Sequence, residues 1–449
     1  MNAISPVSKP VSTNPLKVSA PLGAAMAYLG VEGAVPLFHG SQGCTAFALV
    51  LLVRHFKEAI PLQTTAMNEV STILGGADHV EEALLNLKKR MNPKLVGICS
   101  TALTETRGED FEGDLRLILT RRAEELDGTQ VVFASTPDFN GSLEEGWSKA
   151  TYALVDALVP KCSATSLRQV NILPGVHLTV GDLESLKDLV RKFDLEPIVL
   201  PDVSQSLDGV TTGEWSATTY GGVTLEQIRS MGESCATIAV GEHMRAAAEL
   251  LSERSQAPAY VFPTLVGLEA SDQMVSTLSR LSRMSAPPEV RRERARLVDA
   301  MLDGHFYFAG KKIAIGAEPD LLLGLASLAT DLGARIVAAV TTTPGSKAIE
   351  LTPADVIVGD LGDLEDMAGA ADLLVTHAHG RQAADRLGIP HLRVGFPIFD
   401  RLGSAYRTSI GYSGTRSLIF ETANLFLAAP HAHGHDTHGE TRKQKEQIP

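Results

Sequence analysis

The sequence predicts an α/β protein with three Rossmann-like units, each a parallel sheet with helices on both faces, arranged around a central crevice. Short apolar runs alternate with segments of helical periodicity along most of the chain. Parallel strands need a crossover connection, and the helix of that crossover must cover the sheet. The chain has 449 residues, 44% of them hydrophobic, which suffices for roughly three core-forming domains of about 150 residues each.

The first unit is expected over residues 16–165. Its elements, in order, are a helix over 45–56, a helix over 78–91, a strand over 95–99, a helix over 116–126 and a strand over 131–134. The helix over 78–91 has apolar residues at helical spacing. We expect Asp78 to cap it, with Glu81 as the capping-box partner, and Asn92-Pro93 to end it.

The middle unit is expected over residues 166–286 and the C-terminal unit over 287–428. The middle unit has predicted strands over 170–173, 197–200 and 236–240, with helices over 182–193, from 224 and around 244. The C-terminal unit opens on a charged stretch, has predicted strands over 312–316, 334–340, 355–360, 371–376 and 391–395, and ends in a closing helix. Residues 1–15 are expected to form a flexible arm, and residues 429–449 a disordered His-rich tail.

Composition excludes several classes of function. A net charge of −13 argues against a nucleic-acid partner, because phosphate binding needs a basic face. Four cysteines are too few for a disulfide framework, no apolar run is long enough to cross a membrane, and the N-terminal segment has no apolar core typical of a secretory signal. We therefore expect a cytoplasmic protein without a membrane partner. Neither the phosphate-loop motif nor the dinucleotide fingerprint is present, so nucleotide hydrolysis is not expected.

A single thiol in the segment HGSQGCTAF, residues 39–47, is the first candidate for chemistry. Gly40 and Gly43 permit sharp turns and close approach of the backbone to a ligand. The helix expected over 45–56 places Cys44 near a helix N-terminus, where the dipole and free N–H groups favour the thiolate that ligates iron or zinc. The alternative is a small buried hydrophobe, which is the commoner role of an isolated cysteine.

Several long motifs carry a family resemblance. They are HGSQGC (39–44), RHFKEAIPLQTTAMNE (54–69), GGADHVEEAL (75–84), TPDFNGSLEEGW (136–147), NILPGVHL (171–178), PDVSQSLDG (201–209) and HLRVGFPIFDRLG (391–403). Together they resemble the nitrogenase component 1 family, in particular its β-type chains. The similarity runs in order from about Pro15 to Leu427. It implies the fold of that family.

Departures from the family pattern indicate which branch the chain resembles. In dinitrogenase β chains three cysteines ligate the P-cluster; Cys44 matches one, whereas Leu62 and Ala102 stand at the other two positions. Cys99 lies three residues before Ala102 on a strand, so its side chain does not substitute directly. The pattern is similar to the β-like chain of the scaffold that matures the iron-molybdenum cofactor precursor, a heterotetramer with the α-like chain NifE.

That resemblance implies a cofactor, partners and site residues. Cys44, beside Gly43, would be one ligand of a 4Fe-4S cluster, and three thiolates would come from NifE, which also binds most of the cofactor precursor. The nitrogenase iron protein would be a transient partner and apo-dinitrogenase the cofactor acceptor. No catalytic acid, base or nucleophile is implied, so the chain is expected to be a non-catalytic scaffold.

Two other functions are kept open. One alternative is a catalytic electron-transfer β subunit, either of dinitrogenase or of a related tetrapyrrole-reducing enzyme. The other is a cluster-free binding protein in which the Cys44 side chain only packs.

Packing is the expected role of the other three cysteines, Cys99, Cys162 and Cys235. Among the histidines, His39 is expected either near a cluster or in a structural role. For His377 and His379, which follow a strand end of the third unit, a position facing the central crevice is an alternative rather than the expectation. Histidines after residue 430 are expected in a solvated tail, with metal chelation as the alternative.

Overall fold

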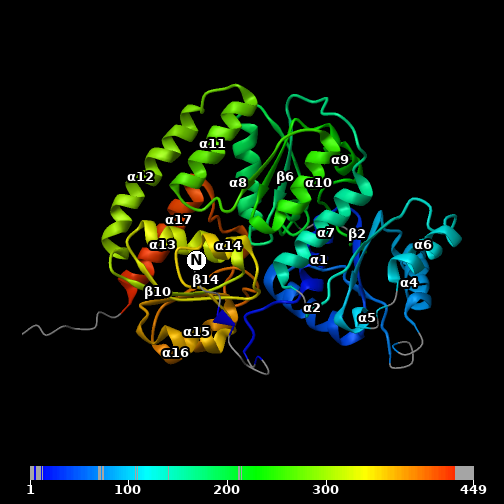
Figure 1. The fold of residues 1–449 in the computed structure, drawn as a ribbon, viewed down its shortest axis with the longest axis horizontal. Helices are drawn as coiled ribbons and strands as arrows, with labels where there is room; N and C mark the ends of the chain where they lie inside the picture. The colour runs from blue at the N-terminus through cyan, green and yellow to red at the C-terminus, as the bar shows by residue number, and fades with distance from the viewer. Residues whose placement is uncertain are drawn as a thin grey trace, which may run out of the picture.

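The computed structural model describes residues 5–6, 12, 14–68, 72, 75–106, 108, 110–139, 141–210, 213 and 215–429. Within these ranges the chain forms three sheets flanked by helices, and Figure 1 shows the three units grouped around a common centre. The strand pairs of all three sheets are parallel. The prediction of three parallel α/β units is confirmed. The unit boundaries predicted near residues 165 and 286 lie in segments between the sheets.

The first sheet has the order β3-β2-β4-β5. Its strands are β2 (Ala34–His39), β3 (Gln63–Thr64), β4 (Leu95–Ser100) and β5 (Gln130–Ala134), and its main helices are α1 (Ala20–Leu29), α2 (Gln42–Phe56), α4 (Ala77–Met91), α6 (Phe111–Arg121) and α7 (Leu143–Leu158). Every residue of β2 and β4 is buried. These two strands therefore form the centre of the unit, and the turn after β2 starts from a rigid base.

Two helix ends in this unit differ from expectation. Gly76 occupies the cap position of α4 without a side-chain hydrogen bond, so the Asp78 cap and its capping box are wrong. Glu81 instead accepts hydrogen bonds from Arg121 and Arg122 on the neighbouring helix. The predicted helix over 116–126 is α6, which begins five residues earlier because Asp110 accepts a hydrogen bond from the Gly113 N–H at 3.0 Å. It ends at Arg121 rather than at 126.

The second sheet has the order β7-β6-β8-β9. Its strands are β6 (Gln169–Pro174), β7 (Glu196–Val199), β8 (Ala236–Val240) and β9 (Ala259–Phe262), and its helices include α8 (Val180–Arg191), α9 (Leu225–Ser230) and α10 (Arg245–Ser255). Capping boxes at Thr179 and Thr224 fix where α8 and α9 begin. The predicted strands are confirmed, and β9 is an additional edge strand.

The third sheet has the order β1-β12-β11-β10-β13-β14. Its strands are β1 (Ser5–Pro6), β10 (Lys312–Gly316), β11 (Arg335–Thr341), β12 (Ile357–Val358), β13 (Leu373–Thr376) and β14 (His391–Arg393), and its helices include α13 (Pro319–Asp331), α15 (Leu361–Met367) and α16 (Arg381–Leu387). The strand predicted over 355–360 is only two residues long. Where residues 1–15 are described, they contact this unit: β1 pairs with β12, and Ser12 Oγ donates to Asp360 at 3.0 Å.

Three long helices complete the fold. They are α11 (Leu268–Ser282), α12 (Pro288–Phe308) and the closing helix α17 (Gly411–Ala428). The charged stretch at the start of the C-terminal unit is part of α12, which packs against α17. Phe308 and Phe426 meet there edge to face, with ring centroids 5.5 Å apart. The predicted tail lies outside the described residues after residue 429.

Two glycines let α1 and α7 cross at very short distance. A Cβ at Gly23 would lie 2.1 Å from the Leu143 carbonyl oxygen, and one at Gly146 would lie 1.8 Å from the Ala20 carbonyl oxygen. Real Cβ atoms do not approach backbone oxygens this closely, so only glycine fits at both positions. This contact fixes the first turn of α7 against α1.

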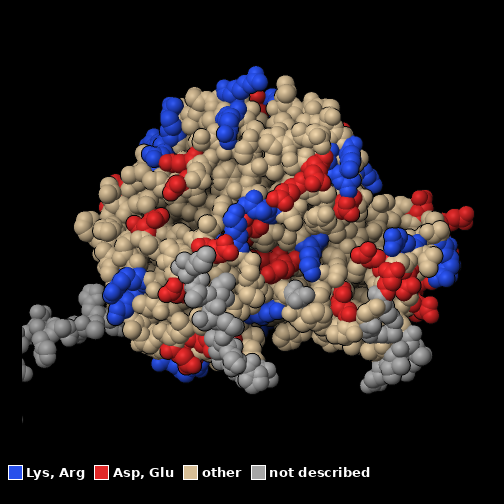
Figure 2. Space-filling view, in the orientation of Figure 1, with Lys and Arg blue, Asp and Glu red and all other residues tan. Residues whose placement is uncertain are grey.

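The surface carries charges of both signs (Figure 2). On the face seen in Figure 2, Lys and Arg side chains are interspersed with Asp and Glu, without a continuous basic patch among the described residues. Across the described part of the chain, none of the helices combines the length and apolar character needed to cross a membrane.

Candidate cluster-binding site at Cys44

The turn between β2 and α2 is held by a network of threonines. The Gly40 N–H donates to Thr65 Oγ1 at 3.1 Å, and the Gly40 carbonyl accepts from the Met67 N–H at 2.9 Å. Thr101 Oγ1 donates to the His39 carbonyl at 3.0 Å. A Cβ at Gly40 would lie 2.4 Å from Thr101 Oγ1, so glycine is required for this close approach. The segment before Cys44 is therefore fixed by two neighbouring loops.

Cys44 lies in the first turn of α2, as predicted. Ser41 is the cap residue, which makes Cys44 the third residue of the helix. The thiol is exposed, and its Sγ lies 3.5 Å from Ser41 Oγ. Gly43 is inside the helix rather than in the turn, and a Cβ there would meet no atom of this chain within 4 Å. Both residues therefore face space that this chain leaves open.

The helix that carries Cys44 is apolar on both of its faces. Its buried face consists of Thr45, Ala48, Leu52 and Phe56. On the outside, Phe47, Val50 and Val53 are 72%, 52% and 40% exposed. A helix that is apolar all round is normally buried, and exposed apolar side chains that lie together mark interaction surfaces. We call these three residues the outer face of α2. The apolar run 45–53 is its signal in the sequence.

The positions that match the other cluster cysteines of dinitrogenase β chains contain no ligand. Leu62 is buried in the hydrophobic core, and Ala102 is the first residue of the short helix α5 (Ala102–Glu105). Cys99 is fully buried on β4, and burial raises the pKa of its thiol far above the usual value. A neutral, enclosed thiol is not available to a cluster at the surface.

The remaining candidates lie elsewhere. Cys162 is half-buried, and its Sγ contacts the Ser163 carbonyl at 3.5 Å; Cys235 packs against the hydrophobic core. His39 is buried, stacks on Phe111 with centroids 4.8 Å apart, and has Nδ1 3.2 Å from Thr65 Oγ1. His377 lines a small cavity between the units, where its Nε2 lies 3.1 Å from the Leu16 carbonyl oxygen. None of these side chains is assigned to the Cys44 site.

The end of α2 is attached to the third unit. The Ile398 N–H donates to His55 Nδ1 at 2.9 Å, and burial lowers the pKa of His55 to about 4. His55 is therefore neutral near pH 7 and does not complement the helix dipole as a cation. The guanidinium of Arg54 lies over the Phe399 ring, 3.9 Å from its centroid. These contacts attach the C-terminal end of α2 to the third unit, whereas its first turn and its outer face stay exposed.

The donor set fits a cluster that is shared between chains. Among the described residues, no group of three or more His, Cys, Asp or Glu side chains with metal-ligand spacing includes Cys44. A cubane needs a ligand at each of its four irons. Among its described residues, this chain therefore offers one exposed thiol at the edge of an apolar surface, and a cubane bound there would need its other ligands from elsewhere.

The chain is similar to known proteins over nearly its whole length. The NifN nitrogenase iron-molybdenum cofactor biosynthesis proteins of Mesorhizobium japonicum and Rhizobium meliloti are each 58% identical to this chain. The first alignment covers 94% of this chain and 93% of the relative, and the second covers 93% and 96%. A solved structure described as nitrogenase Cp1 at pH 6.5 matches with a TM-score of 0.90 and 29% identity over 99% of both chains. The family model for nitrogenase component 1 type oxidoreductases matches residues 19–427. The chain belongs to the nitrogenase component 1 family.

Proposed function

We propose that this chain is the β-like half of a cytoplasmic scaffold on which the iron-molybdenum cofactor precursor of nitrogenase is matured before transfer to apo-dinitrogenase. In this proposal Cys44 is one ligand of a 4Fe-4S cluster at the interface with an α-like chain, NifE, in an α2β2 heterotetramer. NifE supplies the other three thiolates and binds most of the precursor, and the nitrogenase iron protein docks transiently. When bound, the cluster would supply one-electron transfer.

The exposed thiol at the start of an apolar helix is the observation that carries the proposal. Cys44 is exposed, Gly43 faces open space, and Phe47 on the same helix is 72% exposed. Protein interfaces have apolar centres enriched in aromatic residues. The names of the relatives support the assembly role, since they describe cofactor biosynthesis. A partner that covers the outer face of α2 would exclude water from a cluster at Cys44.

The alternative is a catalytic β subunit of dinitrogenase or of a related reductase. The 0.90 TM-score to a nitrogenase structure is the observation that favours it. A P-cluster in that subunit needs thiolates where Leu62 and Ala102 stand here, and Leu62 is buried in the hydrocarbon core. Substrate reduction by the purified two-chain complex, with the iron protein and ATP, would favour the alternative; its absence together with precursor binding would favour the scaffold.

Replacing Cys44 with alanine should weaken binding of the interfacial cluster. We expect the anaerobically purified two-chain complex to contain less iron, and its reduced form to show a weaker electron paramagnetic resonance signal with altered shape, because one iron loses its thiolate. The two chains should still co-purify, since the apolar surface is intact. Cys162→Ala is the matched control and should leave iron content and signal unchanged. An unchanged signal in the Cys44→Ala complex would contradict the ligand assignment.

Introducing a charge on the outer face of α2 should disrupt assembly without unfolding the chain. Phe47→Asp places a carboxylate where the proposal buries an aromatic ring, and burying an unpaired charge costs several kcal/mol. We expect Phe47→Asp to reduce co-purification with the α-like partner by at least tenfold, while circular dichroism of the chain stays unchanged. Leu167→Asp, at another exposed apolar position, should assemble normally. Normal assembly of Phe47→Asp would show that this face is not the interface.

A further inference from the structure

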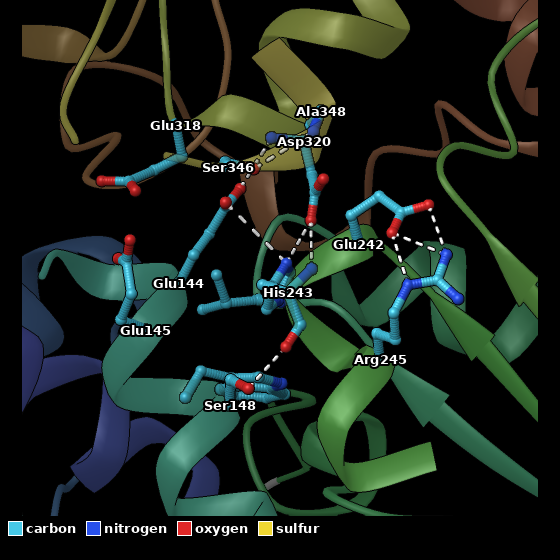
Figure 3. Close-up of polar contacts among 12 residues, drawn as sticks. Glu144, Glu145, Ser148, Glu242, His243, Arg245, Glu318, Asp320, Ser346 and Ala348 are labelled. Carbon is cyan, nitrogen blue, oxygen red and sulfur yellow. Dashed lines mark hydrogen bonds and ion pairs between the residues drawn. The ribbon is translucent and has the colours of Figure 1, made fainter. Parts of the chain in front are cut away.

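A second group of metal-ligating side chains lies at the centre of the molecule, apart from Cys44. It consists of Glu144 on α7, His177 after β6, His243 in the 3-10 turn Glu242–Met244 after β8, and Asp320 on α13. One ligand atom from each side chain lies within 4.8 Å of those from the others. Figure 3 shows Glu144 and Asp320 extending toward His243 from opposite sides. All three units thus contribute to one group, which we call the central quartet.

The central quartet is largely enclosed: its two carboxylates are buried, and its two histidines are partly buried. The side chains of Glu144, His243 and Asp320 are 2%, 6% and 0% exposed. Asp320 Oδ2 contacts His243 Nδ1 and accepts from the His243 backbone N–H at 3.1 Å. Glu144 Oε1 accepts from the Asp320 backbone N–H at 3.0 Å, and its Oε2 lies 3.8 Å from His243 Nδ1. Two carboxylates therefore share one imidazole in a buried site.

Two buried atoms of the quartet lack a partner. Among the described residues, Asp320 Oδ1 and His177 Nδ1 make no hydrogen bond. An unsatisfied buried polar atom destabilises the fold, and native proteins contain few of them. Such atoms in a group of imidazoles and carboxylates indicate a missing ligand.

Two glycines keep space open beside these side chains. A Cβ at Gly175 would lie 2.6 Å from His177 Cε1 and 2.7 Å from His243 Cε1. A Cβ at Gly241, where φ is +106°, would lie 2.8 Å from Asp320 Oδ2. Both glycines are therefore needed for the histidines and the aspartate to converge.

Charge around the quartet also favours a cation. The carboxylates of Asp320, Glu318 and Glu145 lie around Glu144 in this enclosed part of the molecule (Figure 3). A divalent ion would compensate both Glu144 and Asp320 and would occupy the unpaired atoms.

We propose that the central quartet binds one divalent first-row transition-metal ion, with zinc as the best match, that joins the three units. Two imidazoles and two carboxylates are a ligand set that zinc accepts, and four protein ligands make a closed, structural site. Ligand atoms around a tetrahedral zinc lie about 3.4 Å apart, given metal-ligand distances of about 2.0–2.2 Å. The widest pair of ligand atoms would need to close by about 1.4 Å, and the hydrogen-bonded pair of His243 and Asp320 would need to open; both changes are within the reach of rotamer adjustment. This inference does not depend on the proposed function.

The test is a zinc titration of the full-length chain. His431, His433, His435 and His438 in the tail are first replaced by alanine, because they would also bind zinc. After treatment with a chelator, the protein is dialysed against zinc, and bound zinc is measured by elemental analysis. We expect one zinc per chain, a zinc K-edge absorption spectrum showing two imidazoles and only nitrogen and oxygen ligands, and a higher thermal unfolding midpoint with zinc.

Isosteric variants locate the site. Glu144→Gln and Asp320→Asn should each lower zinc affinity at least tenfold and abolish the zinc-dependent rise in midpoint. Glu145→Gln is the matched control on the same helix and should behave like the parent. Equal zinc binding by the parent and both quartet variants would overturn the proposal. Sulfur in the zinc coordination sphere of the parent protein would also overturn the proposal, because the quartet contains no thiol. This second result needs no variant, so it holds even if the variants fail to fold.

Discussion

Gly146→Ala is expected to destabilise the first unit strongly. The added Cβ would lie 1.8 Å from the Ala20 carbonyl oxygen and 2.6 Å from the Ala20 carbonyl carbon. Both atoms are backbone, so no side chain can rotate away, and α1 must separate from α7. Overpacking usually costs about 1–3 kcal/mol, and a clash with backbone belongs at or above the upper end of that range. We expect a loss of about 3 kcal/mol in the free energy of unfolding, measured by urea denaturation.

The control for this substitution is Gly43→Ala. Gly43 is also helical, but a Cβ there meets no atom of this chain within 4 Å. Alanine is favoured over glycine in helices by about 1 kcal/mol, so the isolated chain should be equally or slightly more stable. If Gly146→Ala unfolded at the same urea concentration as the wild type, the close crossing of α1 and α7 would be incorrect.

Lys187→Met is expected to cost on the order of 3–5 kcal/mol, because it leaves a buried carboxylate without its cation. Lys187 on α8 donates to Asp202 Oδ2 at 3.0 Å and to Ser204 Oγ at 2.6 Å. Both charged side chains are nearly enclosed, with exposed fractions of 7% and 8%. The pair connects α8 to the loop after β7, within the PDVSQSLDG motif. The loss should appear as a lower midpoint of thermal or urea unfolding.

Two further variants separate the charge from other effects. Lys192→Met removes an exposed lysine at the end of the same helix and should change stability by less than about 0.5 kcal/mol. Adding Asp202→Asn to Lys187→Met should recover part of the loss, because the amide is neutral and keeps an oxygen that accepts from Ser204. A double variant as unstable as Lys187→Met alone would show that packing, rather than charge, dominates at this site.

The sequence predicts most of the architecture because buried parallel strands are continuous apolar runs. The strands near 95, 131, 170, 236 and 312 are all within two residues of their predicted start. Helix ends are less predictable, since they depend on caps. The spacing of Asp78 and Glu81 fits a capping box, yet Glu81 pairs with arginines of α6, a tertiary contact that local spacing does not encode. The strand near 355 is short because only two of its residues pair with β11.

The candidate site was only partly predictable for a similar reason. The position of Cys44 near a helix start follows from local sequence, and the structure places it in the first turn of α2. The exposed outer face of α2 depends on which side of the helix the rest of the chain covers. The central quartet was not predicted, because its members come from three units. Its one signal was that His177, His243 and Asp320 each follow closely after the carboxyl end of a parallel strand, where ligand sites gather.

The pairing of β1 with β12 has a consequence for how the chain is made on the ribosome. Ser5 pairs with Ile357, which is synthesised 352 residues later. Leu16 likewise packs into the core of the third unit. At about 5–20 residues per second, the leading segment waits roughly 20 to 70 s for its binding site to emerge. The first and second units can fold in that interval, but Ser5 and Leu16 are seated only after the strands of the third unit have been translated.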